Sequence, residues 1–386
     1  MTRLFPRLVP PTIRLAAFRT LFLLAILSNI VLVFSARPAF ASSVPHQFQE
    51  RRSGSNRVPG AESPLPVFEF HSGFWVNLHH FLYLQARLSK DDLGPQEMRG
   101  AIPANEYPVS LNDFPAAEIR DWQDAVAFYA KDLARRDLNL NGDMETINNR
   151  LAEMETCKEL AGKSSADCRS GLQSGLVDVL DRAAGVYRAH WWAEQDHANR
   201  EWIAQVAPMV SDLGVELSGQ LADVYQRPWP SGRLRVDVVG YAGPFGAYSS
   251  LNPVHVTISS SDARNQGIYG FEALFHESSH ALAGAVIEAI SHEFRDRDKP
   301  IPRNLWHALL FYTTGELIRR DLAYQSIPKS SLQGIDPLHY EPYAVRFGIY
   351  SGAWDRFHGD LDLYWQPYLQ GQTSFESAIA RLAGAE

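Results

Sequence analysis

The sequence predicts an α+β protein that is predominantly α-helical. Apolar residues recur at helical spacing through most of the chain, whereas only two short segments show the alternation of a half-buried strand. These two segments, residues 233–238 and 254–259, come shortly before a helix that carries the motif His-Glu-x-x-His. We therefore expect a short sheet next to the motif helix and a helical region before it.

The first 41 residues have the features of a secretory signal peptide. An apolar run at residues 21–34 is followed by small residues where a signal peptidase requires them, Ala39 and Ala41. Four arginines precede the run: Arg3, Arg7, Arg14 and Arg19. The run is short for a membrane span, which needs about 20 residues, and an uncleaved anchor is the alternative. We expect an exported protein, periplasmic or extracellular, that meets a membrane only if this segment is not cleaved.

The rest of the chain divides into a linker and two regions. Residues 42–66 are rich in Ser, Pro, Gly and Arg without periodicity, which predicts a disordered linker. Helical spacing then returns in six segments, at residues 70–88, 116–133, 144–155, 171–187, 193–206 and 211–225. Proline and glycine interrupt the chain just before the first strand. The sequence therefore predicts a helical N-terminal region at residues 67–228 and a second domain at residues 229–386.

The net charge limits the classes of binding partner, and the two cysteines indicate a disulfide. The predicted signal holds five arginines and no acid, so its removal takes the net charge from -8 to -8 - 5 = -13. Such an acidic protein is a poor partner for nucleic acid or for anionic lipid. In an oxidising compartment the only two cysteines, Cys157 and Cys168, are expected to form a disulfide. Zinc binding by this pair is the alternative, but further ligands at suitable spacing are missing.

The motif spans His276 to His280. Two histidines four residues apart lie on one face of a helix, one turn apart, so both imidazoles can point at one metal ion. Glu277 follows the first of them and can act as general base for a zinc-activated water. The flanking residues 270–275 and 281–287 are largely apolar and contain no proline, which predicts a long, buried helix. A helix that carries two histidines by accident is the alternative.

A catalytic zinc site needs a third protein ligand and an open fourth position. A third histidine on the same helix would require glycine and histidine where Ala283 and Val286 stand. Glu288 lies roughly 12 Å further along the helix than His280, too far to reach the same ion. The third ligand must therefore come from another helix.

Glu316 is the favoured third ligand. It stands on an apolar helix at residues 304–320, where Gly315 would let two helices approach closely. An ion pair with Arg320 is the ordinary alternative for this carboxylate. His307 is the second candidate ligand; it lies nine residues earlier, on the opposite side of the helix, so both cannot face the ion.

Residues 233–321 resemble the gluzincins, the thermolysin-like clan of zinc peptidases. The resemblance implies a zincin-like catalytic domain at residues 229–386 and one Zn²⁺ ion bound by His276, His280 and Glu316, with Glu277 as base. It also implies a strand next to the motif helix whose edge pairs with an extended peptide. A tyrosine or histidine is expected to stabilise the oxyanion. The candidates are Tyr340, Tyr343, Tyr350 and His358, and we favour Tyr350 because glycines stand on either side of it at positions 348 and 352.

The sequence thus predicts an exported zinc-dependent hydrolase, in the first place a peptidase. Its expected partner is a peptide or protein substrate. Two alternatives stay open: a catalytically inactive zincin-fold binding module of the cell envelope, and a zinc hydrolase of non-peptide amides or esters.

Overall fold

A computed structural model of the chain describes residues 67–90, 92–93, 110–324 and 336–385. The predicted signal peptide at residues 1–41 and the predicted linker at residues 42–66 lie outside the described residues. All described residues belong to one compact unit, Ser53–Glu386. Within the described ranges, no helix is both long and apolar enough to cross a membrane.

Helices make up most of the described chain. The α-helices are α1 (Phe74–Leu88), α2 (Ala116–Lys131), α3 (Gly142–Glu153), α4 (Ser174–His190), α5 (Trp192–Tyr225), α6 (Ile268–Ser279), α7 (Gly284–Asp296), α8 (Leu305–Tyr324), α10 (Tyr343–Arg346), α11 (Asp355–Asp360), α12 (Gln366–Leu369) and α13 (Phe375–Ala385). Short 3₁₀ turns are η3 (Leu133–Arg135), η4 (Ala166–Cys168), η5 (Ala263–Asn265), η6 (His280–Leu282), η7 (Pro337–His339) and η8 (Gly352–Trp354), and η9 (Leu361–Trp365) is a π-helical turn.

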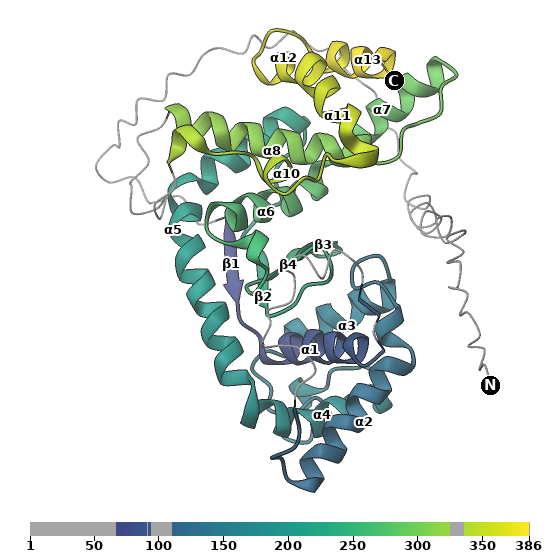
Figure 1. Ribbon diagram of the computed structural model, residues 1–386, viewed down its shortest axis with the longest axis vertical. Coiled ribbons are helices and arrows are strands. Elements are labelled where there is room, and N and C mark those ends of the chain that lie inside the picture. Colours follow the sequence, from purple (N-terminus) through teal and green to yellow (C-terminus); the bar gives the residue numbers. More distant parts are fainter. Residues whose placement is uncertain (1–66, 91, 94–109, 325–335, 386) are drawn as a thin grey trace, which may run out of the picture. The chain divides into compact units, whose positions relative to one another are not determined.

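Four strands form one mixed sheet in the order β1-β2-β4-β3 (Figure 1). They are β1 (Phe68–His71), β2 (Leu234–Val239), β3 (Ala247–Leu251) and β4 (Val254–Ser259). β2 runs parallel to β1 and β4, whereas β3 is antiparallel to β4. β2 and β4 are the two strands that the sequence predicts. β1 and β3 were not expected: β1 overlaps the start of a predicted helix, and β3 lies in the glycine-rich connection.

The sheet separates two hydrophobic cores. α6 packs on one face of it, and α1 and α3 contact the other (Figure 1). The first core contains Val236 and Val256 with residues of α5, α6, α8 and the C-terminal helices. The second contains Tyr241 and Tyr248 with residues of α1, α2, α3 and α4. Successive side chains of a strand point to opposite faces, so alternate residues face one core or the other.

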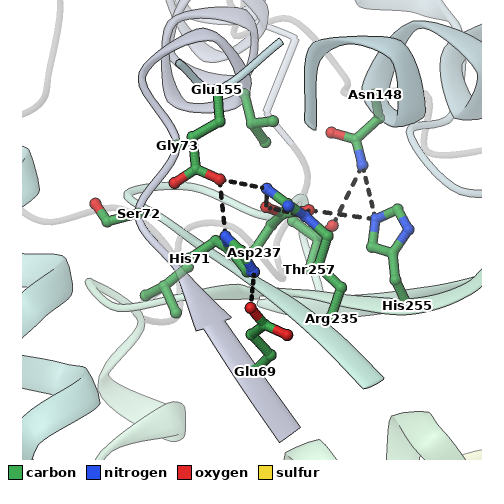
Figure 2. Close-up of polar contacts among 12 residues, drawn as sticks. Glu69, His71, Ser72, Gly73, Asn148, Glu155, Arg235, Asp237, His255 and Thr257 are labelled. Carbon is green, nitrogen blue, oxygen red and sulfur yellow. Dashed lines mark hydrogen bonds and ion pairs between the residues drawn. The ribbon is translucent and has the colours of Figure 1, made fainter. Parts of the chain in front are cut away.

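The face of the sheet turned toward α1 and α3 carries a cluster of polar side chains (Figure 2). Arg235 makes a bidentate contact with the buried Asp237 and also donates to Glu155, at 3.1 Å. Glu155 in turn accepts from His71 of β1, at 2.7 Å. Each charged group therefore has a partner of opposite sign, as burial demands. This cluster ties β1, β2 and the end of α3 together.

The predicted fold class, α+β and predominantly α, is confirmed. The predicted boundary at residue 228 stays a prediction. The disulfide is confirmed: Cys157 and Cys168 are joined, with their Cα atoms 5.5 Å apart. One helical boundary is wrong, because α5 continues through Pro208 where two helices were expected. Burial of Val206, Met209 and Val210 on both sides of the proline holds the helix together.

Candidate metal centre

Two glycines, Gly267 and Gly270, shape the entry of the chain into the motif helix α6. Gly267 precedes the helix with φ 56°, a left-handed conformation that favours glycine. A Cβ on Gly270 would lie 2.3 Å from the carbonyl oxygen of Asn265 and 3.0 Å from the Trp202 ring. The chain thus enters α6 through a turn that only small residues permit, and this turn fixes where the first helical residues lie.

The motif histidines occupy consecutive turns of helical backbone. His276 belongs to α6, and His280 opens η6 with φ -56° and ψ -32°, so the right-handed helical path continues through both residues. Their ring centroids are 5.1 Å apart. The expected long helix is divided by the η6 turn into α6 and α7, and the division begins at His280, the last residue of the motif. The predicted geometry, two imidazoles on one face, is present.

A third imidazole, from His307 of α8, joins them. The Nε2 atoms of His276 and His307 are 3.2 Å apart, and one nitrogen from each of the three histidines lies within 4.8 Å of the others. Two nitrogens bound to one tetrahedral zinc at about 2.0–2.1 Å stand roughly 3.3 Å apart. The separation between His276 and His307 therefore matches that between two ligands of one ion.

The structure brings His307, and not the expected Glu316, to the two motif histidines. The Glu316 carboxylate pairs with Arg319 of the same helix and accepts from Gln366 of α12 at 3.1 Å. His307 and Glu316 are nine residues apart and face opposite sides of α8, so one rotation of the helix decides between them. The rotation adopted turns His307 to the motif. The alternative partner expected for Glu316, Arg320, is replaced by Arg319.

Gly315 does permit a close approach, as expected. A Cβ there would lie 2.9 Å from Glu272 Oε1 of α6 and 2.5 Å from Pro342 Cβ. The approach brings α8 against α6 and thereby supports the position of His307.

Tyr350, the residue favoured for stabilising the oxyanion, is hydrogen-bonded to the backbone of α8. The Tyr350 side chain is buried, and its hydroxyl donates to the carbonyl oxygen of Ala308 at 3.1 Å. Its ring stacks on His358. This hydrogen bond ties the segment after α10 to α8, and the role of Tyr350 at the oxyanion stays a prediction. Tyr340 is engaged too, because its hydroxyl donates to Glu272.

Burial keeps the three imidazoles in the neutral form. Burial lowers the pKa of His280 from 6.5 to about 4. It also lowers the pKa of His276 and of His307 well below 6.5, and the charges of neighbouring imidazoles add to the shift at these two residues. A neutral imidazole is the form that binds a metal. His280 Nε2 is buried and has no hydrogen-bond partner among the described residues. An unpartnered nitrogen beside two other nitrogens fits a site built for a cation.

The Glu277 carboxylate lies beside one of the three imidazoles, that of His280. Its Oε2 atom lies 3.9 Å from His280 Nε2 and accepts a hydrogen bond from the hydroxyl of Ser249 at 3.1 Å. Burial raises the pKa of Glu277 from 4.5 to about 7, and the Ser249 hydrogen bond opposes that shift. A carboxylate whose pKa lies near neutrality can both accept and return a proton.

Aromatic rings surround the imidazoles. Phe311, one turn after His307 on α8, stacks on His276 with a centroid distance of 3.5 Å. Trp306 stacks on His307, and the Trp354 ring meets His307 edge-on at 5.5 Å. These rings hold the imidazoles in place and keep their surroundings apolar.

The arrangement could hold one metal ion on three nitrogens. Neutral imidazoles suit zinc and several other transition metals, so the donor set alone leaves the identity of the ion open.

The sequence did not predict Ser249 or the aromatic rings as parts of the site. The five residues of β3 are too few and too polar to show a clear strand pattern, so Ser249 gave no signal. The aromatic positions gave one, because Trp306 and Phe311 stand directly before and one turn after His307.

The chain was compared with protein-family models, with curated proteins and with solved structures, and none of the three comparisons gave a match.

Proposed function

We propose that the protein is an exported zinc-dependent hydrolase that cleaves peptide bonds. One observation carries the proposal: His276, His280 and His307 bring three neutral imidazole nitrogens together, with the Glu277 carboxylate next to them. Three nitrogen ligands and an adjacent carboxylate are the parts of a catalytic zinc site with an open fourth position. The proposed ligand set departs from the two histidines and one glutamate of the gluzincins. The order of sheet, motif helix and following helix supports the zincin-like core only as part of this proposal.

The chain's own residues divide the work as follows. When bound, zinc would polarise the substrate carbonyl and lower the pKa of water to about 7. Glu277 takes the proton of the attacking water and passes it to the leaving amine. The aromatic rings around the imidazoles exclude bulk water, which strengthens each electrostatic contact.

An extended peptide fits the edge strand β3. β3 ends the sheet, and among the described strands none pairs with its outer edge. Ser259 N–H of β4 donates to Gly246 O, just before β3. In an antiparallel ladder every second residue bonds to the neighbouring strand, so Tyr248 and Ser250 are the residues of β3 whose peptide groups face β4. The peptide groups of Ala247, Ser249 and Leu251 therefore point away from β4. Such an edge can pair with the backbone of a substrate.

The proposed location rests on two observations. The sequence begins with an arginine-led apolar run of the signal-peptide type. The chain also contains the Cys157–Cys168 disulfide, which persists in oxidising compartments.

Elemental analysis and a peptide-library digest test the function together. The purified protein should contain one zinc per chain and cleave members of the library. Glu277→Gln should keep the zinc and lose turnover by about 10²- to 10⁴-fold. Full turnover in that variant would contradict the mechanism. Zinc without turnover on any peptide would favour a binding module, and cleavage of amide or ester compounds alone would favour a non-peptide hydrolase.

A further inference from the structure

Ser249 links the edge strand to the motif helix. Its hydroxyl donates to Glu277 Oε2 at 3.1 Å, and the residue is only 5% exposed. A hydrogen bond to a carboxylate is stronger than one between neutral groups, and shelter from water preserves that strength. No other hydrogen bond to the Glu277 side chain is formed within the described part of the chain.

The neighbouring serine of the same strand has no such role. Ser250 points to the opposite face of the sheet, since successive side chains of a strand alternate. Its hydroxyl is buried and has no hydrogen-bond partner in the part of the chain that the structure describes. β3 therefore carries two adjacent buried serines, of which only the first reaches the candidate metal centre.

We propose that Ser249 is a positioning residue for Glu277, an inference that rests on the proposed function. One oxygen of the carboxylate is held between the Ser249 hydroxyl and His280 Nε2, which is 3.9 Å from it. Holding that oxygen restricts the side-chain torsions of Glu277 and aims its lone pairs at the space beside the imidazoles. A base that is already aimed loses less entropy when it takes a proton from the attacking water.

The same residue also relates the base to a bound peptide. The Ser249 peptide group points away from β4, while its side chain points to α6. A substrate backbone that pairs with this peptide group would therefore lie at a fixed register relative to Glu277. Removal of the hydroxyl leaves the main chain of the edge intact, so substrate binding should persist while the chemical step slows.

The experiment compares Ser249→Ala with Ser249→Thr and Ser250→Ala. With a cleaved library peptide, Ser249→Ala should lower kcat roughly 10-fold at unchanged KM, because one hydrogen bond to a charged group is lost. Ser249→Thr, which keeps the hydroxyl, and the matched control Ser250→Ala should both behave as the wild type. Unchanged kcat in Ser249→Ala, or equal losses in Ser249→Ala and Ser249→Thr, would overturn the proposal.

A second readout separates this inference from the proposed function. Co²⁺ replaces zinc as a spectroscopic probe, and the visible absorption bands of the Co²⁺ protein report on groups next to the ion. Ser249→Ala should shift these bands, whereas Ser250→Ala should not. If Ser249→Ala shifts the Co²⁺ bands although the wild type cleaves no peptide, the role of Ser249 is supported and the peptidase is rejected. Identical bands in Ser249→Ala and wild type, or failure of the wild type to bind Co²⁺, would reject the role of Ser249.

Discussion

The Nε2 atoms of His276 and His307 lie 3.2 Å apart, although the residues belong to different helices and are 31 positions apart in the chain. Two neutral imidazoles can meet in this way through a hydrogen bond, if one nitrogen carries the proton, or through a shared cation, if neither does. His280 supplies a third nitrogen to the cluster, and its buried Nε2 has no hydrogen-bond partner within the described ranges. The shared cation accounts for all three nitrogens, whereas the hydrogen bond accounts for two.

The third ligand can be tested by comparing His307→Ala with Glu316→Ala. Loss of His307 should weaken Zn²⁺ binding by on the order of 100-fold or more, since even a residue that only supports a ligand contributes about 10- to 100-fold. Glu316→Ala should keep near wild-type affinity, because that carboxylate pairs with Arg319. Calorimetric titration of chelator-treated protein measures both, with circular dichroism as a check of folding. The reverse order of affinities would restore Glu316 as the ligand.

The part of the site that could be predicted is the part set by local geometry. His276, Glu277 and His280 follow from a spacing of four on one helix, which holds wherever the helix lies. The third ligand depends on how α8 is rotated about its own axis. Either His307 or Glu316 could face the motif, and the choice is made by contacts distant in sequence, such as Gln366 on Glu316 and Tyr350 on the backbone of α8. Local spacing contains no information on that rotation.

The fold was predictable to a similar extent. Long amphipathic segments identify helices because packing of one face stabilises them. β1 and β3 are four and five residues long and owe their conformation to the ladders that they form with β2 and β4. Pro208 predicts a break, but the buried residues around it keep α5 continuous. Each departure thus arises where tertiary contacts outweigh a local preference.

Asp237→Asn should destabilise the fold through the polar cluster of Figure 2. Asp237 is fully buried, and its charge is balanced by Arg235, which is itself only 26% exposed. Without the carboxylate, the buried part of the guanidinium keeps only Glu155 as a counter-ion. We expect a loss of about 3 kcal/mol in the free energy of unfolding, measured with urea.

The matched control for that prediction is Arg233→Met. Arg233 contacts Glu69 at 3.3 Å, with about half of each side chain exposed. An exposed pair of this kind is worth roughly 0–1 kcal/mol, so the control should change stability far less. Equal losses in the two variants would show that burial does not govern the cluster.

Glu272 should make stability fall as the pH rises. The carboxyl is 1% exposed, and its Oε2 accepts from the Tyr340 hydroxyl and from the Tyr343 N–H. Its Oε1 has no hydrogen-bond partner among the residues that the structure describes. Burial raises the pKa of Glu272 from 4.5 to about 8, although both hydrogen bonds oppose the shift. The unfolded chain therefore releases this proton at lower pH than the folded protein, and the contribution of Glu272 to stability is largest below pH 4.5 and declines until about pH 8.

Glu272→Gln keeps an acceptor for Tyr340 and Tyr343 but cannot ionise. In chelator-treated protein, its free energy of unfolding relative to wild type should rise by roughly 3 kcal/mol between pH 5 and pH 8, as measured by urea unfolding at each pH. Glu341→Gln controls for the change in net charge, because Glu341 is exposed and lies between Tyr340 and Tyr343. A difference between Glu272→Gln and wild type that stays constant with pH would show that Glu272 is ionised throughout this range in the folded protein.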